Sequence, residues 1–284
     1  MEDADSILII ESGSTKSDWV WVDKGNTQQF TTPGFNPFYQ SSEQILSELQ
    51  KNEALAQLSS FDGNIFFYGA GCSDEAHCEV VKNAFKTHFP QANIEIQHDL
   101  LAAARSCYKT EPVVIGILGT GSNCCFFNGE TLVQETPSLG FLLGDEGSGS
   151  YIGKGFIASY LYGQVPLSIA TKFNDQFNLS KTDILNQVYH TTKPNTYLAQ
   201  FTAFLGACKN EEFVQDLVCD AFRQFVRNHV LAYKSHFPCK ICFVGSVAFH
   251  FQNTLMEVIE EYGLEMGTIN QSPLEGLVGY HLRE

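Results

Sequence analysis

The sequence predicts an α/β protein built from two similar halves. Three observations support this: a hairpin-and-turn pattern that occurs twice, alternating helical and strand-like segments after each copy, and a globular composition. Of the 284 residues, 44% are hydrophobic and 17% are charged, so a sizeable core is expected. Because no linker-like segment separates the halves, we place a hinge near residues 110–112 and expect domains at residues 1–110 and 111–284.

The first copy of the pattern begins near residue 7. The apolar runs 7–11 (ILIIE) and 18–22 (DWVWV) flank the turn-rich segment 12–16 (SGSTK), which is typical of a β-hairpin. A further turn at 23–26 leads to a third strand near 28–31. This half should therefore open with three antiparallel strands.

The second copy begins near residue 115 with IGILGTGSN. It continues through CCFF, a turn at 128–130 and TLVQE. Aligning Gly13 with Gly119 superposes the strands and turns of both copies. Such an internal repeat predicts two halves of the same construction.

Helices and strands alternate after each copy. In the first half we expect a helix at 41–58 capped by Ser41 and Gln44, then the strand NIFFYG, a helix at 73–89, the strand IEIQ and a helix after Asp99. In the second half we expect a helical region at 211–236, the strand KICFVG and a helix starting near Val247.

The charge balance narrows the classes of partner. The net charge of −15 repels nucleic acid and anionic membranes, so neither is expected as a partner. The acidic start MEDADSILII does not resemble a secretion signal, and no apolar run is long enough to span a bilayer. The nine scattered cysteines are typical of reduced thiols. We therefore expect a cytoplasmic protein.

The tips of the two hairpins are rich in Gly, Ser and Thr. Their backbone N–H groups and hydroxyls suit phosphate oxygens, and glycine permits a close approach. A single turn of this kind is weak evidence for phosphate binding, because Gly-Ser turns usually only join strands. Their recurrence at equivalent positions favours a polyphosphate held by both tips.

Six segments, taken in order, resemble the N-acetylglucosamine kinase and BadF/BadG ATPase family: IESGSTKSDW, FFYGAG, HDLLAAAR, GILGTGSN, LGFLLGDEGSG and CFVGSVAFH. The resemblance runs from about residue 7 to the C-terminus. It implies a duplicated actin-like ATPase (ribonuclease H-like) fold, with two domains around a cleft for nucleotide and sugar. The family's sugar kinases transfer the γ-phosphate of ATP to an amino-sugar hydroxyl, usually at C6, and homodimers are common.

The resemblance implies a set of nucleotide-binding residues. The first phosphate loop corresponds to Gly13, Ser14, Thr15 and Lys16, the second to Gly119, Thr120, Gly121 and Ser122, and the adenosine segment to Gly245, Ser246 and Phe249. For the adenosine segment, a plain strand-to-helix connection is an equally good interpretation of the local residues.

The resemblance makes Asp99 the catalytic base that accepts the proton of the sugar hydroxyl. Asp99 follows a strand and opens a helix, so it also suits a helix cap, and both roles are compatible. A carboxylate at the end of such a strand is expected to point into the crevice where ligands bind.

The expected sugar contacts lie in three segments of the chain. They are Asn36, Pro37, Asp99, Ser138, Leu139, Gly140 and Asp145. Asn before Pro is also a common turn former, and Leu139 stands where the family often has Trp. Glu146 has no assigned role, since two adjacent acids before a helix also suit its dipole.

Glu11 occupies a position that is usually Asp in the family, where it helps to hold Mg²⁺ through water. Mg²⁺ requires tight octahedral geometry, so the extra methylene leaves three alternatives open. Glu11 still binds Mg²⁺, the enzyme is slow or tuned to another ion, or activity has been lost.

Two other classes of function compete with a kinase. A BadF-type activator ATPase would hold an iron–sulfur cluster, but Cys239 and Cys242 are expected on opposite faces of one strand. A non-catalytic sugar or nucleotide sensor is the second rival. Among substrates, we favour N-acetylglucosamine over N-acetylmuramic acid and glucosamine, because no basic residue stands beside Asn36 or residues 138–145 to receive a lactyl group.

Overall fold

The computed structural model describes residues 6–13 and 16–282 of the chain. It divides into two compact units, one formed by Met1–Ser106 together with Pro273–Glu284 and the other by Cys107–Ser272. The chain thus leaves the first unit close to the expected hinge. The division differs from the expected one in two respects: the boundary lies four residues earlier, and the segment from Pro273 onward belongs to the first unit.

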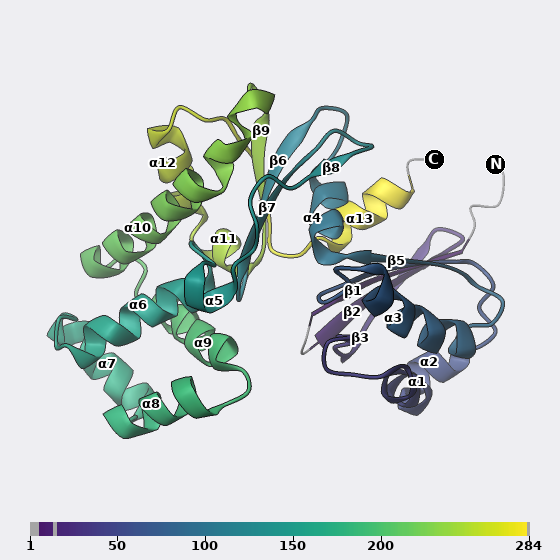
Figure 1. Ribbon diagram of the computed structural model, residues 1–284, viewed down its shortest axis with the longest axis horizontal. Helices are drawn as coiled ribbons and strands as arrows, with labels where there is room; N and C mark the ends of the chain where they lie inside the picture. Colours follow the sequence, from purple (N-terminus) through teal and green to yellow (C-terminus); the bar gives the residue numbers. More distant parts are fainter. Residues whose placement is uncertain (1–5, 14–15, 283–284) are drawn as a thin grey trace. The chain divides into compact units, whose positions relative to one another are not determined.

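The sheet of the first unit has the strand order β3-β2-β1-β4-β5 (Figure 1). Strands β1, β2 and β3 form an antiparallel meander, whereas β4 and β5 continue the sheet in parallel with β1. The strands are β1 (Ile7–Ser12), β2 (Lys16–Asp23), β3 (Asn26–Pro33), β4 (Asn64–Gly69) and β5 (Asn93–His98). All five lie where the sequence predicts them.

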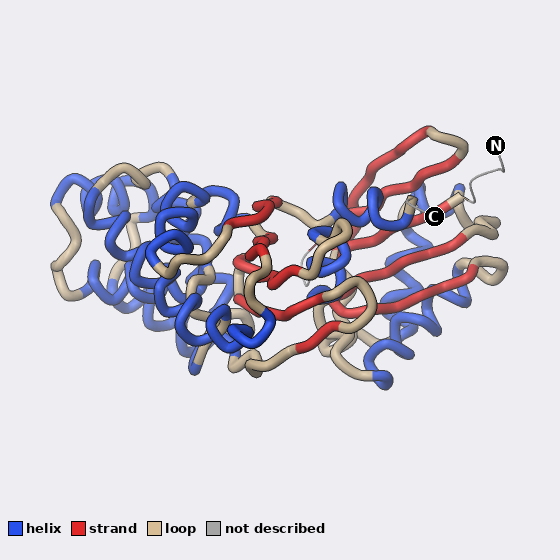
Figure 2. The backbone as a smooth tube through the Cα atoms, turned by 90° about the horizontal axis from the view of Figure 1, so that it is seen from above, coloured by secondary structure: helices blue, strands red, loops and turns tan. Residues whose placement is uncertain are grey.

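The sheet of the second unit repeats this topology. Its order is β10-β9-β6-β7-β8, so β6 to β8 form the meander and β9 and β10 run parallel to β6. The strands are β6 (Val113–Leu118), β7 (Ser122–Phe127), β8 (Leu132–Val133), β9 (Lys240–Val244) and β10 (Met266–Asn270). Figure 2 shows the strands in red. The predicted internal duplication is confirmed.

Helices cover both faces of the first sheet. They are α1 (Ser42–Lys51), α2 (Glu53–Gln57), α3 (Glu75–His88), α4 (Asp99–Cys107) and α13 (Leu274–His281). The Ser41–Gln44 capping box is present, but Asn52 caps a new helix, so the expected helix at 41–58 is two helices. On one face the buried Trp19 stacks between Phe30 and Phe85.

The opposite face of this sheet is covered by α4 and α13. Ile7, Ile9 and Val20 pack there against Ala102 of α4 and Leu277 of α13. The C-terminal helix is thus part of the core of the first unit, although it follows β10 of the second sheet in the chain.

The second unit contains more helix than the sequence analysis anticipated. Its helices are α5 (Gly140–Leu143), α6 (Gly149–Leu161), α7 (Leu167–Phe177), α8 (Lys181–His190), α9 (Pro194–Gly206), α10 (Glu212–Asn228), the 3₁₀ helix η1 (Val230–His236), α11 (Ser246–His250) and α12 (Gln252–Glu261). Phe156, Phe173 and Phe201 form the centre of an aromatic cluster that joins α6, α7 and α9. Within residues 6–13 and 16–282, every helix is too short or too polar to cross a bilayer.

Candidate functional site

The first hairpin joins β1 to β2. The Gly13 N–H donates a hydrogen bond to the Lys16 carbonyl oxygen (2.9 Å), and the buried Ser12 and Ser17 hydroxyl oxygens lie 2.6 Å apart at its base. The Lys16 ammonium forms an ion pair with Asp18 at 2.7 Å. Two predicted phosphate ligands, Ser14 and Thr15, lie outside the described residues.

Two carboxylates face each other beside this hairpin. Glu11 and Asp18 are direct neighbours across β1 and β2, and strand alternation places both on the face that α4 and α13 cover. Burial raises the pKa of Glu11 to about 7, the negative charges of Asp18 and Asp99 contribute to the increase, and Lys16 opposes it. A cation or a proton would therefore be stabilised here.

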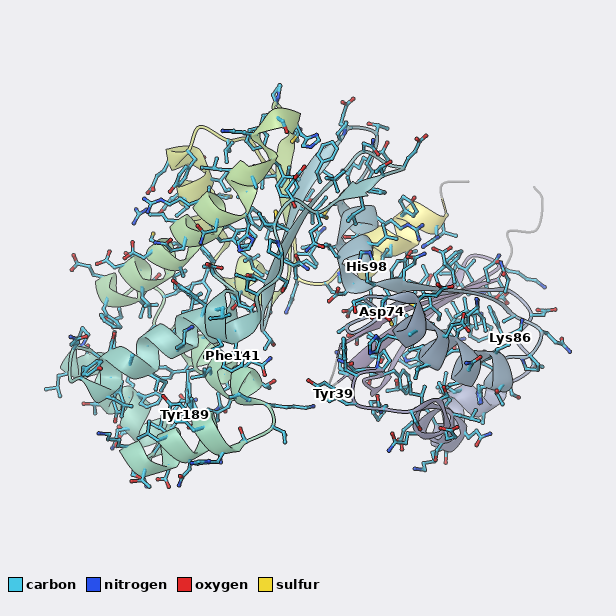
Figure 3. The ribbon with its side chains drawn as sticks, in the orientation of Figure 1. Tyr39, Asp74, Lys86, His98, Phe141 and Tyr189 are labelled. Carbon is cyan, nitrogen blue, oxygen red and sulfur yellow. The ribbon has the colours of Figure 1, made fainter. Side chains whose placement is uncertain are left out.

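Asp99 opens α4 directly after β5. The preceding His98, labelled in Figure 3, accepts a hydrogen bond on Nδ1 from the Leu101 N–H (3.2 Å), so the His98 ring caps the helix. Burial raises the pKa of the Asp99 carboxyl, although His98 and hydrogen bonds from the first backbone N–H groups of α4 oppose this. The pKa of this acid thus moves towards the range in which a general base works best.

The loop that carries Asn36 is tied to the end of β1. The buried Asn36 side chain accepts a hydrogen bond on Oδ1 from the Phe38 N–H (3.0 Å), which is the turn-forming role that the sequence allows. The Ser12 hydroxyl accepts a hydrogen bond from the backbone of the same loop, and Pro37 is buried. Gly71 lies so close that a Cβ there would be 2.4 Å from Asn36 Oδ1.

The second hairpin joins β6 to β7 and rests on the start of α6. The carbonyl oxygens of Gly119 and Thr120 accept hydrogen bonds from the N–H groups of Gly149 (2.8 Å) and Ser150 (3.0 Å). The tip itself is closed by the Gly119 N–H, which donates to the Gly121 carbonyl oxygen (3.0 Å). These bonds fix the tip in position.

Asp145 packs directly against this hairpin. Its Oδ1 accepts a hydrogen bond from the Ser122 N–H (3.3 Å), and a Cβ at Gly121 would be 3.0 Å from its Oδ2. Asp145 is only 8% exposed and has a φ of 58°, a conformation that costs energy outside glycine. Burial raises its pKa. The second hairpin thus joins a predicted sugar contact, Asp145, to predicted phosphate contacts.

The remaining predicted sugar contacts lie just before Asp145. Ser138 and Leu139 are exposed, and Gly140 begins α5 with a φ of 70°. A Cβ at Gly144 would be 3.0 Å from the Leu139 Cβ, so this segment folds back on itself ahead of Asp145.

Glu146 has a structural role. Its Oε1 accepts a hydrogen bond from Asn228 Nδ2 (2.8 Å), and its Oε2 lies 3.1 Å from His229 Nε2. Burial alone would raise the pKa of Glu146, but hydrogen bonds from its own backbone N–H, His229 and Asn228 lower it. Glu146 therefore anchors the loop that carries Asp145 to α10.

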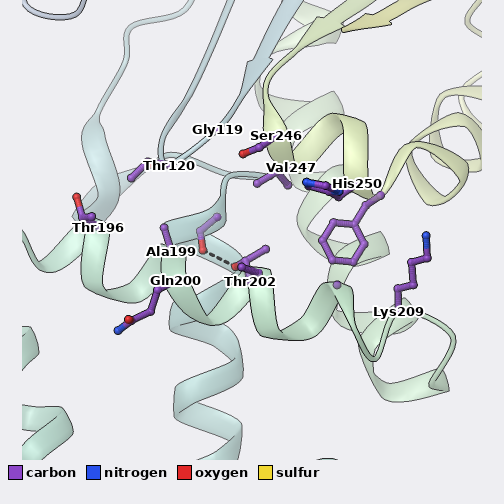
Figure 4. A pocket seen from close by; sticks show the side chains of 14 residues that line it. Gly119, Thr120, Thr196, Ala199, Gln200, Thr202, Lys209, Ser246, Val247 and His250 are labelled. Atoms are coloured by element: carbon purple, nitrogen blue, oxygen red, sulfur yellow. Dashed lines mark hydrogen bonds between the residues drawn. The ribbon is translucent and has the colours of Figure 1, made fainter. Parts of the chain in front are cut away.

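A cavity of about 590 Å³ borders the second hairpin (Figure 4). Helix α9 forms one wall and α11 the other, and Lys209 lies at one end. The lining residues are Gly119, Thr120, Gly149, Thr196, Ala199, Gln200, Thr202, Ala203, Gly206, Lys209, Ser246, Val247, His250 and Phe251. The cavity therefore combines apolar walls with the polar tip of a glycine turn.

The predicted adenosine segment contributes to this cavity only in part. Gly245 has a φ of 127°, and a Cβ there would be 2.3 Å from the Leu118 carbonyl oxygen, so glycine is required where β9 leads into α11. Ser246 lines the cavity. Phe249 does not line it and instead contacts the His250 ring, because the lining positions on this side belong to Val247, His250 and Phe251.

Comparison with solved structures identifies the family. A candidate N-acetylglucosamine kinase from Porphyromonas gingivalis is 38% identical, with a TM-score of 0.91, covering 97% of this chain and 98% of its own. The chain belongs to the N-acetylglucosamine kinase family. No protein-family profile matched the chain, and no curated protein sequence did.

The structure of the present protein also resembles more distant proteins of the same fold. A candidate N-acetylglucosamine kinase from Chromobacterium violaceum has a TM-score of 0.68 at 12% identity, covering 98% of this chain and 99% of its own. The ROK hexokinase from Thermus thermophilus has a TM-score of 0.57 at 14% identity, with 98% and 97% covered. These likenesses confirm the predicted duplicated actin-like α/β fold.

In the present protein, the carboxylates of Glu11 and Asp18 suit a magnesium ion that is bound mainly through phosphate and water. Within residues 6–13 and 16–282, no group of three or more His, Cys, Asp or Glu side chains is arranged as a complete metal site. Mg²⁺ retains several waters and takes one or two carboxylates together with substrate phosphates. Glu11 and Asp18 provide such a pair beside the first hairpin.

Some residues of the candidate site were absent from the sequence prediction. Asp18 could have been found, because pairing the two strands about the hairpin puts it opposite Glu11. Thr196, Gln200 and Lys209 carry no motif and become neighbours of the second hairpin only through the packing of α9.

Proposed function

We propose that the protein transfers the γ-phosphate of ATP to the 6-hydroxyl of an N-acetylated amino sugar, with N-acetylglucosamine as the preferred substrate. The observation that carries the proposal is the glycine hairpin at the edge of the 590 Å³ cavity of the second unit. The 38% identity with a candidate N-acetylglucosamine kinase supports the amino-sugar assignment.

The second hairpin is suited to phosphate for a reason beyond composition. A Cβ at Gly119 would meet no atom within 4 Å, and its φ lies outside the left-handed region, so neither packing nor backbone conformation demands glycine there. The close approach of a phosphate oxygen to backbone N–H groups would demand it. We assign Gly119, Thr120, Gly121 and Ser122 to the phosphates. The Ser122 hydroxyl is buried and has no partner among the described residues, so it suits such an acceptor.

The cavity beside that hairpin suits a nucleoside. Ala199, Val247 and Phe251 supply apolar surface for the base, and Ser246 and Gln200 supply polar groups. At the first unit, Gly13 and Lys16 remain assigned to the phosphates. Glu11 and Asp18 would hold Mg²⁺ through water, and the bound ion would neutralise charge on the phosphates.

Asp99 is assigned as the general base. Its raised pKa favours proton uptake from a hydroxyl, and such a base contributes roughly 10²- to 10⁴-fold in rate. For the sugar, we assign Asn36 and Pro37 in the first unit and Ser138 to Gly140 with Asp145 in the second. The second oxygen of Asp145 does not take part in the Ser122 hydrogen bond and is the one that would accept from a sugar hydroxyl.

The deciding experiment measures sugar-dependent ADP release with ATP and Mg²⁺. N-acetylglucosamine, N-acetylmuramic acid, N-acetylmannosamine, glucosamine and glucose are compared on the native protein and on Asp99→Asn. We expect N-acetylglucosamine to give the highest kcat/KM, and Asp99→Asn to lower kcat at least about 100-fold with little change in KM for ATP.

Three outcomes would contradict parts of the proposal. Near-normal kcat in Asp99→Asn would remove the base assignment, and preference for another sugar would replace the substrate. Binding of ATP and sugar by calorimetry without ADP release would indicate a sensor rather than a kinase.

A further inference from the structure

A second cavity of the second unit, of about 700 Å³, is lined by three cysteines. It lies near the ends of β9 and β10, away from the glycine hairpin. Its lining residues are Cys107, Lys109, Thr110, Glu111, Pro112, Val113, Phe126, His236, Pro238, Cys239, Lys240, Cys242, Glu265, Met266, Gly267 and Thr268. None of them was assigned to ATP or sugar.

Two of these cysteines contact each other. The thiol of Cys107, the last residue of α4, is a hydrogen-bond partner of Cys242 on β9. Both residues are buried at 5% and 3% exposure, yet both line the cavity. The two sulfur atoms are therefore neighbours in a space that a small molecule could enter.

The neighbouring strand is shaped around Cys242. The pairing of β10 with β9 shifts register between Met266 and Ile269. At this irregularity, a Cβ on Gly267 would lie 2.5 Å from Cys242 Sγ. Thr268 donates hydrogen bonds to Cys242 from its side chain and its backbone. Glycine and the bulge thus make room for the sulfur atom and direct donors towards it.

These donors favour the thiolate form of Cys242. The hydrogen bond with Cys107 makes the largest contribution and lowers the pKa of Cys242, whereas burial raises it. The hydrogen bonds from Thr268 and the positive charge of Lys240 lower it further, and the resulting pKa is about 6. Burial instead raises the pKa of Cys125 and Cys239. A thiolate is the reactive form of cysteine.

We propose that Cys242 and Cys107 form a dithiol site that exchanges reversibly with low-molecular-weight disulfides entering this cavity. The Cys242 sulfur attacks one sulfur of the disulfide R–S–S–R, so that its S–S bond breaks, the mixed disulfide Cys242–S–S–R forms, and RS⁻ leaves and takes a proton from water. Cys107 then loses its proton to water and attacks the Cys242 sulfur, which releases the second RS⁻. Two protein thiols are oxidised to one disulfide while R–S–S–R is reduced to two thiols.

The experiment treats the full-length reduced protein with 4,4′-dithiodipyridine and follows 4-thiopyridone release between pH 5 and 8. We expect a fast phase that releases two equivalents, at least about tenfold faster at pH 6.5 than the remaining thiols react, with a half-maximal rate near pH 6. Tryptic mapping of the native protein should then join peptides 106–109 and 241–283, whereas Cys239 lies in the separate peptide 235–240.

Three variants test the order of the steps. Cys242→Ser should remove the fast phase, and Cys107→Ser should release only one fast equivalent and retain the mixed disulfide at Cys242. Cys239→Ser is the matched control and should behave as the native protein does. Survival of the fast phase in Cys242→Ser, its loss in Cys239→Ser, or absence of the joined peptides from the native protein would overturn the proposal. Peptide mapping of the native protein does not depend on whether a variant folds.

Discussion

Replacing Glu11 with Gln should stabilise the protein at pH 8. Because burial and neighbouring negative charge raise the pKa of Glu11 from 4.5 to about 7, its ionised form is disfavoured in the folded state. The ionised Glu11 side chain would destabilise the folded state by about 3 kcal/mol if the pKa shift counted in full. Because the side chain is partly exposed and screened by solvent, we expect a destabilisation of about 1.5 kcal/mol. The penalty is absent below pH 4.5, grows between pH 4.5 and 7, and is constant above pH 7.

Thermal unfolding followed by circular dichroism, without nucleotide or divalent metal, measures this effect. At pH 8 the transition of the first unit should rise by roughly 5 °C in Glu11→Gln, and at pH 5 the gain should fall to about a quarter. Glu11→Asp retains the charge and should not show this gain. Asp62→Asn, which removes an equally charged but exposed side chain from the same unit, should leave the transition nearly unchanged. Equal gains at both pH values, or a loss at pH 8, would refute the reasoning.

Two glycine substitutions test the two units separately. Gly71→Ala should raise KM for the sugar at least about fivefold, because its Cβ would displace the Asn36 side chain. Gly25→Ala is the control for backbone strain, since Gly25 has a similar φ and its Cβ would meet no atom within 4 Å. An equal rise in KM in Gly25→Ala would contradict the explanation. Gly245→Ala should lower the free energy of unfolding of the second unit by about 2–4 kcal/mol in urea titrations. Gly206→Ala, whose Cβ meets no atom within 4 Å, should cost little, and a matching loss there would count against the clash.

Local patterns predicted all five strands of the first sheet and four of the second, but not β10. Alternation, turn residues and the internal repeat located β1, β4 and β6 to within about two residues, because each of these signals lies within a short stretch of chain. The same kind of local reasoning did not find the second acceptor at the start of α4, the ring of His98, which takes the Leu101 N–H while Asp99 accepts from the first backbone N–H groups.

Features that depend on distant packing were missed. Helices α6 and α9 are buried on several sides, so their sequences lack the polar face that marks a surface helix. The cavity residues Thr196 and Gln200 lie on α9, so they could not be assigned to the site before this helix was known. The contact of Asp145 with Ser122 joins residues 23 positions apart, and no pattern within either segment predicts it.

The position of α13 bears on how the protein is made. The hydrogen bond between Tyr68 and His281 (2.8 Å) spans 213 residues, and Leu277 is fully buried against the sheet of the first unit. During synthesis, Ile7, Ile9 and their neighbours remain without this cover until the ribosome has passed through the whole second unit. The N-terminal unit, although it is synthesised first, therefore completes its core last. In the nascent chain, the apolar sheet face that α13 later covers is the expected binding site for a chaperone.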